Sequence, residues 1–147
     1  MVNVKGSCQC GAIQYQVDGE LLATLMCYCT ECHKVSAGYG TMTVLINQSN
    51  FHLTKGTLKV WQRSSDSGNL NRAHFCGDCG NRVYHQNPDK PDIIRLKTGT
   101  LANSASYTPQ AHLWLKSAPS WVVIPEDTLT FETQPSLADL LALIKEQ

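Results

Sequence analysis

Seven cysteines in three short groups limit the fold of this 147-residue chain more than any other feature of its sequence. The groups are a Cys-x-Cys pair, a Cys-x-Cys-x-x-Cys run and a Cys-x-x-Cys pair: Cys8 and Cys10; Cys27, Cys29 and Cys32; Cys76 and Cys79. Because seven is odd, a framework in which every cysteine forms a disulfide is excluded. In a reducing compartment, clustered cysteines more often bind metal or take part in chemistry. We therefore expect a zinc protein.

Charge and hydropathy limit the location and the partners of the chain. Lys and Arg number 12, as do Asp and Glu, so the formal charge is zero and there is no electrostatic case for nucleic acid or an anionic membrane as main partner. The first eight residues lack the apolar core of a signal peptide, and no stretch approaches the length of a membrane span. We expect a soluble, cytoplasmic protein with a single domain over residues 1–147.

Zinc binds thiolates at about 2.3 Å in a tetrahedron, so its ligands come as close pairs from separate segments. Cys76 and Cys79 have the two-residue gap of a zinc knuckle, and Gly80 allows a tight turn after them. Cys8 and Cys10 would share one face of an extended segment and could reach the same ion. The two pairs together predict a closed, structural four-cysteine site.

Three cysteines then remain: Cys27, Cys29 and Cys32. Three protein ligands with one exchangeable position are typical of a catalytic zinc, where a bound water or thiol loses its proton more easily. Spacing leaves two alternatives open. A histidine such as His33 or His74 could close the second site, or the run could form a redox disulfide, although the βαβ pattern of such redox proteins is absent here.

The rest of the chain reads as mainly β. Ile13, Tyr15 and Val17 alternate with polar residues, and turn residues separate further short apolar runs. Strands are predicted over residues 12–17, 21–27, 39–46, 51–54, 58–62, 71–75, 93–98, 111–115 and, more weakly marked, 129–132.

One helix is predicted, near the C-terminus. Ser136 can cap it with Asp139 three residues later. Its apolar stripe for core packing consists of Leu137, Leu140, Leu141 and Ile144.

Four segments together resemble the glutathione-dependent formaldehyde-activating enzyme family, whose domain centromere protein V shares. They are residues 6–12 (GSCQCGA), 27–32 (CYCTEC), 74–80 (HFCGDCG) and 117–121 (SAPSW). The resemblance spans about residues 5–133 in the right order, and every cysteine of the family motif is present.

The resemblance implies a β-tent zinc fold of short antiparallel sheets with a short C-terminal helix. It implies two Zn²⁺ ions per chain, one structural and one catalytic: Cys8, Cys10, Cys76 and Cys79 for the first; Cys27, Cys29 and Cys32 for the second. It also implies a carbon–sulfur lyase that forms or cleaves S-hydroxymethylglutathione, with glutathione as the default thiol. The alternative is a non-catalytic zinc module that binds a protein partner and has both zinc sites closed.

No motif places a residue on the substrate. Lys34, Arg72 and Arg82 could meet the carboxylates of glutathione, but we expect ordinary solvated charges at these positions. Tyr39 and Trp121 could line a pocket, but we expect core or half-buried packing for both. The sequence gives neither the substrate nor the oligomeric state.

Overall fold

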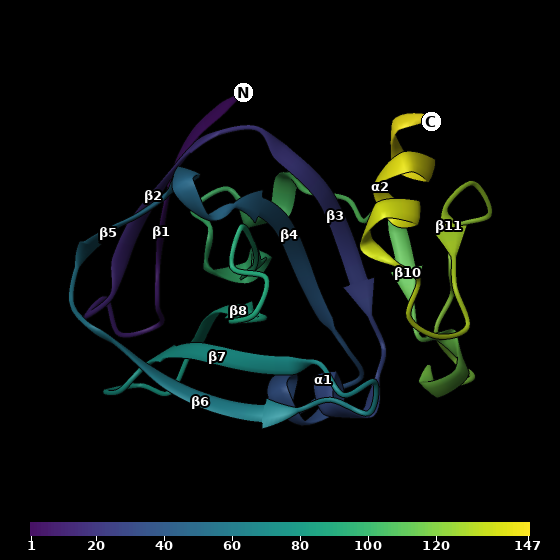
Figure 1. Ribbon diagram of the computed structural model, residues 1–147, viewed down its shortest axis with the longest axis horizontal. Helices are drawn as coiled ribbons and strands as arrows, with labels where there is room; N and C mark the ends of the chain where they lie inside the picture. Colours follow the sequence, from purple (N-terminus) through teal and green to yellow (C-terminus); the bar gives the residue numbers. More distant parts are fainter. The chain divides into compact units, whose positions relative to one another are not determined.

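Eleven strands and two α-helices make up the computed structural model, which describes residues 1–147 (Figure 1). The prediction of a mainly β chain with a short C-terminal helix is confirmed. The chain divides into two compact units, Met1–Leu22 with Val44–Ser106 and Ala23–Thr43 with Tyr107–Gln147. The single domain over residues 1–147 stays a prediction. None of the helices has the length and hydropathy for a membrane crossing.

The first unit contains a three-stranded antiparallel sheet. β1 (Val2–Ser7) pairs with β2 (Gln14–Gly19), and β2 pairs with β5 (Phe51–Lys55). Tyr15 of β2 is buried, its ring stacks on Phe51 at 5.0 Å, and its hydroxyl lies 2.6 Å from Oγ1 of Thr100. This sheet holds the Cys8–Cys10 segment between its first two strands.

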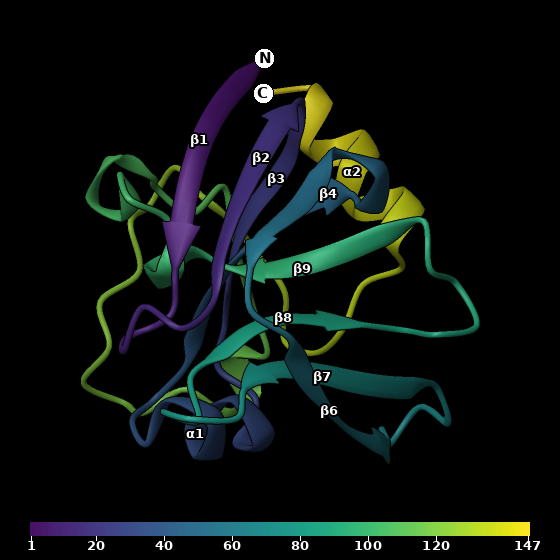
Figure 2. The same cartoon turned by 90° about the vertical axis from the view of Figure 1, so that its left-hand side faces the viewer.

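The same unit contains four antiparallel strands in the order in which they follow along the chain (Figure 2). They are β6 (Leu58–Ser64), β7 (Leu70–Cys76), β8 (Arg82–Gln86) and β9 (Ile93–Lys97). Val83, Ile94 and Leu96 are fully buried apolar residues of β8 and β9. The turn between β7 and β8 carries Cys76 and Cys79.

The second unit is built on parallel pairing. β10 (Ala111–Leu113) pairs in parallel with β3 (Leu21–Cys27) on one side and with β11 (Leu129–Thr130) on the other. The expectation of antiparallel sheets alone is therefore wrong here. A distant chain segment, rather than a hairpin, supplies the neighbour of β3. β4 (Thr41–Asn47) runs from this unit into the first.

Two α-helices belong to the second unit: α1 (Thr30–Ser36) and α2 (Leu137–Lys145). Ser136 caps α2 as predicted, because its hydroxyl accepts a hydrogen bond from the backbone N–H of Asp139 at 3.1 Å. Leu140 and Ile144 are buried, whereas Leu137 is 38% exposed, so the buried stripe is narrower than predicted. The expectation of only one helix is wrong, since α1 begins within the second cysteine group and continues to Ser36.

Short 3₁₀ turns complete the chain: Gln48–Asn50, Thr98–Thr100, Ser104–Ser106 and Leu115–Ser117. All nine predicted strands are present; β3 has the predicted bounds, and the other eight differ at one or both ends. Two further strands, β1 and β8, were not predicted. β1 is short and largely polar, and β8 borders the polar, proline-containing loop after Gln86.

Candidate metal centres

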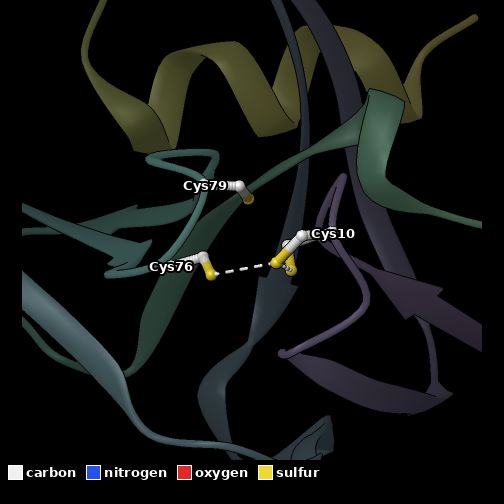
Figure 3. Close-up of side chains that lie close together, drawn as sticks. Cys10, Cys76 and Cys79 are labelled. Carbon is white, nitrogen blue, oxygen red and sulfur yellow. Dashed lines mark hydrogen bonds between the residues drawn. The ribbon is translucent and has the colours of Figure 1, made fainter.

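Four sulfur atoms of the first unit lie within 4.8 Å of one another: those of Cys8, Cys10, Cys76 and Cys79. The Cys8 and Cys10 sulfurs are 3.7 Å apart, and those of Cys10 and Cys76 are 3.8 Å apart (Figure 3). Thiolates at about 2.3 Å from a tetrahedral zinc are about 3.8 Å from each other. The spacing of these sulfurs therefore fits a four-coordinate zinc ion.

A tight turn presents Cys76 and Cys79. The backbone N–H of Cys76 donates to the carbonyl of Asn81 at 3.0 Å, and that of Gly80 donates to the carbonyl of Cys76 at 2.8 Å. Gly80 has a φ of +77°, in the left-handed region that favours glycine. The knuckle expected from the Cys-x-x-Cys spacing is therefore present.

Cys8 and Cys10 lie in a second turn of the same kind. The backbone N–H of Cys8 donates to the carbonyl of Ile13 at 3.1 Å, and that of Gly11 donates to the carbonyl of Cys8 at 3.2 Å. The expectation that an extended segment places the two side chains on one face is wrong. β1 ends at Ser7, and the turn brings the sulfurs together instead.

Asn81 joins the two turns and was missed by sequence reasoning. Its Oδ1 accepts a hydrogen bond from the backbone N–H of Gln9 at 2.9 Å, and its Nδ2 donates to the carbonyl of Arg82 at 3.2 Å. Its place two residues after Cys79 was the only available signal. This side chain fixes the spacing of the two sulfur pairs.

Two thiols of this cluster, those of Cys10 and Cys79, have pKa values shifted in opposite directions. Hydrogen bonds from the backbone of Asn81 and then of Cys10 lower the pKa of Cys79 to about 6. A backbone hydrogen bond from Ala12 lowers the pKa of Cys10, but burial and the neighbouring thiols outweigh it and raise the pKa to about 12. A bound dication would hold all four as thiolates.

The other three sulfurs belong to the second unit and also lie within 4.8 Å of one another: those of Cys27, Cys29 and Cys32. Cys27 ends β3, and Cys29 is the N-cap of α1. The Cys29 sulfur accepts a hydrogen bond from the backbone N–H of Cys32 at 3.3 Å. The first turn of α1 thus brings Cys29 and Cys32 close together.

Two thiols of this cluster, those of Cys27 and Cys29, have a raised pKa. Cys29, then Cys32 and burial, raise the pKa of Cys27 far above its usual range. A hydrogen bond from Cys27 lowers the pKa of Cys29, but Cys32 and burial outweigh it, and the net shift is upward. A bound positive ion would stabilise the thiolate forms of these cysteines, as in the first cluster.

Both clusters consist of cysteine alone. Neither His33 nor His74 contributes an atom to them. The His33 Nε2 atom is buried without a hydrogen-bond partner, and the His74 ring stacks on Tyr84 with centroids 4.1 Å apart. The geometry therefore gives no support to a histidine ligand at either cluster.

Three aromatic side chains, starting with Tyr28 between Cys27 and Cys29, contact one another in sequence. Tyr28 is buried, and its hydroxyl lies 2.7 Å from Nδ1 of His112. Its ring stacks on that of Tyr39, with ring centroids 6.2 Å apart. Tyr39 meets Trp121 edge-on at 5.0 Å. Tyr39 is 42% and Trp121 66% exposed, so neither ring lies in the core; Tyr39 is half-buried as expected, whereas Trp121 is mostly exposed.

The three cations considered for a substrate all contact protein side chains. Lys34 is exposed, and its Nζ lies 3.8 Å from Oε1 of Glu31. Arg72 donates from Nε to Oε1 of Gln62 at 3.0 Å. Arg82 lies 5.6 Å from the centre of the Trp61 ring. Nothing in these contacts marks a carboxylate site.

Comparison with protein families decides the relationship of the chain. Residues 3–117 match the family described as glutathione-dependent formaldehyde-activating enzyme. The chain belongs to this family. The matched range includes both cysteine clusters and ends before Trp121.

One curated protein and one solved structure are also similar to this chain. A curated protein of Halomonas elongata, provisionally named a glutathione-dependent formaldehyde-activating enzyme, is 25% identical over 126 residues, which cover 82% of this chain and 80% of that protein. A crystal structure of a Rhodobacter sphaeroides protein is 21% identical with a TM-score of 0.54, over 86% of this chain and 98% of the other. At this identity the crystal structure bears on the fold alone.

Proposed function

We propose that this chain is a zinc-dependent carbon–sulfur lyase of the glutathione-dependent formaldehyde-activating type. The observation that carries the proposal is the unequal size of two all-cysteine clusters in a member of this family: four sulfurs in one and three in the other. Zinc in proteins takes four ligands, so three thiolates leave one position for a water or a substrate thiol.

The residues have separate roles in this proposal. Cys8, Cys10, Cys76 and Cys79 hold a structural zinc, and Asn81 sets the distance between their two turns. Cys27, Cys29 and Cys32 hold a second zinc. When bound there, zinc would stabilise a substrate thiol in its thiolate form or polarise an aldehyde oxygen.

The reaction is an addition that needs no further reactant. The sulfur of glutathione forms a bond to the carbon of formaldehyde, and the π electrons of the carbonyl move to its oxygen. The proton lost by the thiol is gained by that oxygen, which gives S-hydroxymethylglutathione. The reverse reaction cleaves the carbon–sulfur bond. The role of this chain is to bind and orient the thiol, because three sulfur ligands would leave one position of a four-coordinate zinc for it.

Exchange spectroscopy tests this proposal directly. Glutathione and formaldehyde interconvert with their adduct without a catalyst, so nuclear magnetic resonance can compare the exchange rate with and without the zinc-loaded protein. We expect the wild-type protein to accelerate the exchange and the Cys27→Ser variant not to do so. Equal rates with the two proteins would rule out this activity.

The competing hypothesis is a non-catalytic zinc module with a closed second site. It requires a fourth protein ligand beside Cys27, Cys29 and Cys32, and His33 is the nearest candidate along the chain. Loss of the second zinc in a His33→Ala variant would favour this module. We expect that variant to keep both ions, because His33 is not part of the cluster.

A further inference from the structure

Thr41 contacts the second cluster from outside the cysteine run. Its Oγ1 donates a hydrogen bond to the sulfur of Cys32 at 3.2 Å. Thr41 is the first residue of β4 and is 8% exposed. It belongs to the same unit as the three cysteines, and no motif singled it out.

Gly40 explains why Thr41 reaches this sulfur. A Cβ atom at Gly40 would lie 2.6 Å from the carbonyl oxygen of Cys27 and 2.9 Å from Cε of Met26. Real Cβ atoms essentially never come closer than about 3.0 Å to such atoms. The chain entering β4 therefore passes directly against the end of β3, and this close approach places the next residue, Thr41, beside Cys32.

The donor on Cys32 differs in kind from those on other sulfurs of the two clusters. The Cys8 sulfur accepts from the backbone N–H of Ile13 at 3.2 Å, and the Cys29 sulfur accepts from the backbone N–H of Cys32 at 3.3 Å. Backbone donors are independent of side-chain identity. The donor to Cys32 is a hydroxyl, so a single substitution can remove it without changing the cluster.

We propose that Thr41 is a positioning residue for the zinc held by Cys27, Cys29 and Cys32. Its hydroxyl orients the Cys32 sulfur toward the ion and offsets part of the negative charge of the thiolate. Groups that hydrogen-bond to metal ligands fix ligand orientation and tune the metal, and their loss typically weakens metal binding by about 10–100-fold. The inference rests on the proposed zinc at this cluster but not on the chemistry performed there.

A pair of matched variants tests the role of the hydroxyl. Thr41→Val keeps the shape of the side chain and removes the donor, whereas Thr41→Ser keeps the donor. Competition with a chelator measures zinc affinity at each cluster, and the four-cysteine site of the first unit is an internal control. We expect Thr41→Val to weaken the second site by about 10–100-fold. The Thr41→Ser variant should stay close to wild type, and the first site should not change.

Cobalt substitution gives a readout that packing alone would not change. We expect the sulfur-to-cobalt charge-transfer band of the second site to shift to longer wavelength in Thr41→Val, because a thiolate without its donor releases an electron more easily. Gly40→Ala, which pushes the segment away from β3, should cause the same shift and the same loss of affinity.

Two results with the variants would overturn the proposal. One is equal zinc affinity and an unchanged cobalt spectrum in Thr41→Val. The other is an equal loss in Thr41→Val and Thr41→Ser, which would assign the effect to packing. A wild-type protein with no zinc at the second cluster would remove its basis as well. If the metal results are as expected and the glutathione adduct exchange is not accelerated, the proposed function fails and the role of Thr41 stands.

Discussion

The hydroxyl of Tyr28 lies 2.7 Å from Nδ1 of His112, and the two rings stack with centroids 5.8 Å apart and planes at 12°. Tyr28 stands between the candidate ligands Cys27 and Cys29, and His112 lies on β10. The backbone N–H of Tyr28 also donates to the carbonyl of Leu113 at 3.0 Å. β10 therefore holds the chain segment that carries two of the three sulfurs.

Removal of the Tyr28 hydroxyl should destabilise the protein. His112 is 6% exposed, so Tyr28→Phe leaves its Nδ1 buried without this partner, which costs about 1–3 kcal/mol of unfolding free energy. Denaturant unfolding measures this loss. The matched control is the double variant Tyr28→Phe with His112→Phe. Its cost should be less than the sum of the two single costs, and strict additivity would show that the hydrogen bond contributes nothing.

The protonation of His112 should make stability depend on pH. Burial lowers its pKa below the usual 6.5, so the folded protein keeps the ring neutral where the unfolded chain binds a proton. Stability is then present above about pH 6.5 and falls as the pH decreases from there toward the folded pKa. Unfolding experiments on zinc-loaded protein between about pH 7 and pH 5.5 measure this slope. His112→Gln should flatten it, and an unchanged slope would contradict the assignment.

The fold class and both cysteine clusters were predictable from the sequence because their signals are local. Cys76, Cys79 and Gly80 define a knuckle within five residues, and the Ser136 cap and apolar spacing define α2. The residues that contact the cysteine segments from elsewhere in the chain were not predictable. Asn81, Thr41 and His112 reach their neighbours through turns or distant strands, and an isolated asparagine, threonine or histidine has no distinctive pattern.

The helix α1 was not predicted, because its N-terminus lacks the usual local signal. Cys29 caps it through its sulfur, which accepts the N–H of Cys32, whereas the usual capping residues use oxygen. The sequence pattern therefore predicts no helix over residues 30–36. The parallel pairing of β10 with β3 and with β11 was not predictable, because β10 and β11 are short and lie far along the chain from β3.

Serine substitutions at the two clusters should have unequal effects on stability. Structural zinc contributes about 10–16 kcal/mol of binding free energy in small zinc domains, and this couples directly to folding. We expect Cys76→Ser to lower the yield of folded protein or its melting temperature strongly. Cys29→Ser should remove one zinc and any activity with a smaller thermal effect. Equal losses in a thermal unfolding scan would contradict the division into structural and catalytic sites.

The exposure of Trp121 leads to a prediction about substrate binding. Trp121 is 66% exposed, so Trp121→Ala should change the unfolding free energy by no more than about 0.5 kcal/mol. If the ring lines the path to the second cluster, the apparent KM for glutathione should rise while the kcat is kept. The control is Trp61→Ala, an exposed tryptophan of the first unit. Equal kinetic effects of the two substitutions would rule out a specific role for Trp121.

Zinc content per chain tests the central claim most directly. The account predicts two zinc ions per chain in the purified wild-type protein, one of them removed quickly by a chelator. Cys29→Ser should retain one ion, the slowly removed one. A single tightly held zinc in the wild-type protein, with the thiols of Cys27, Cys29 and Cys32 free to react with a thiol reagent, would contradict the account.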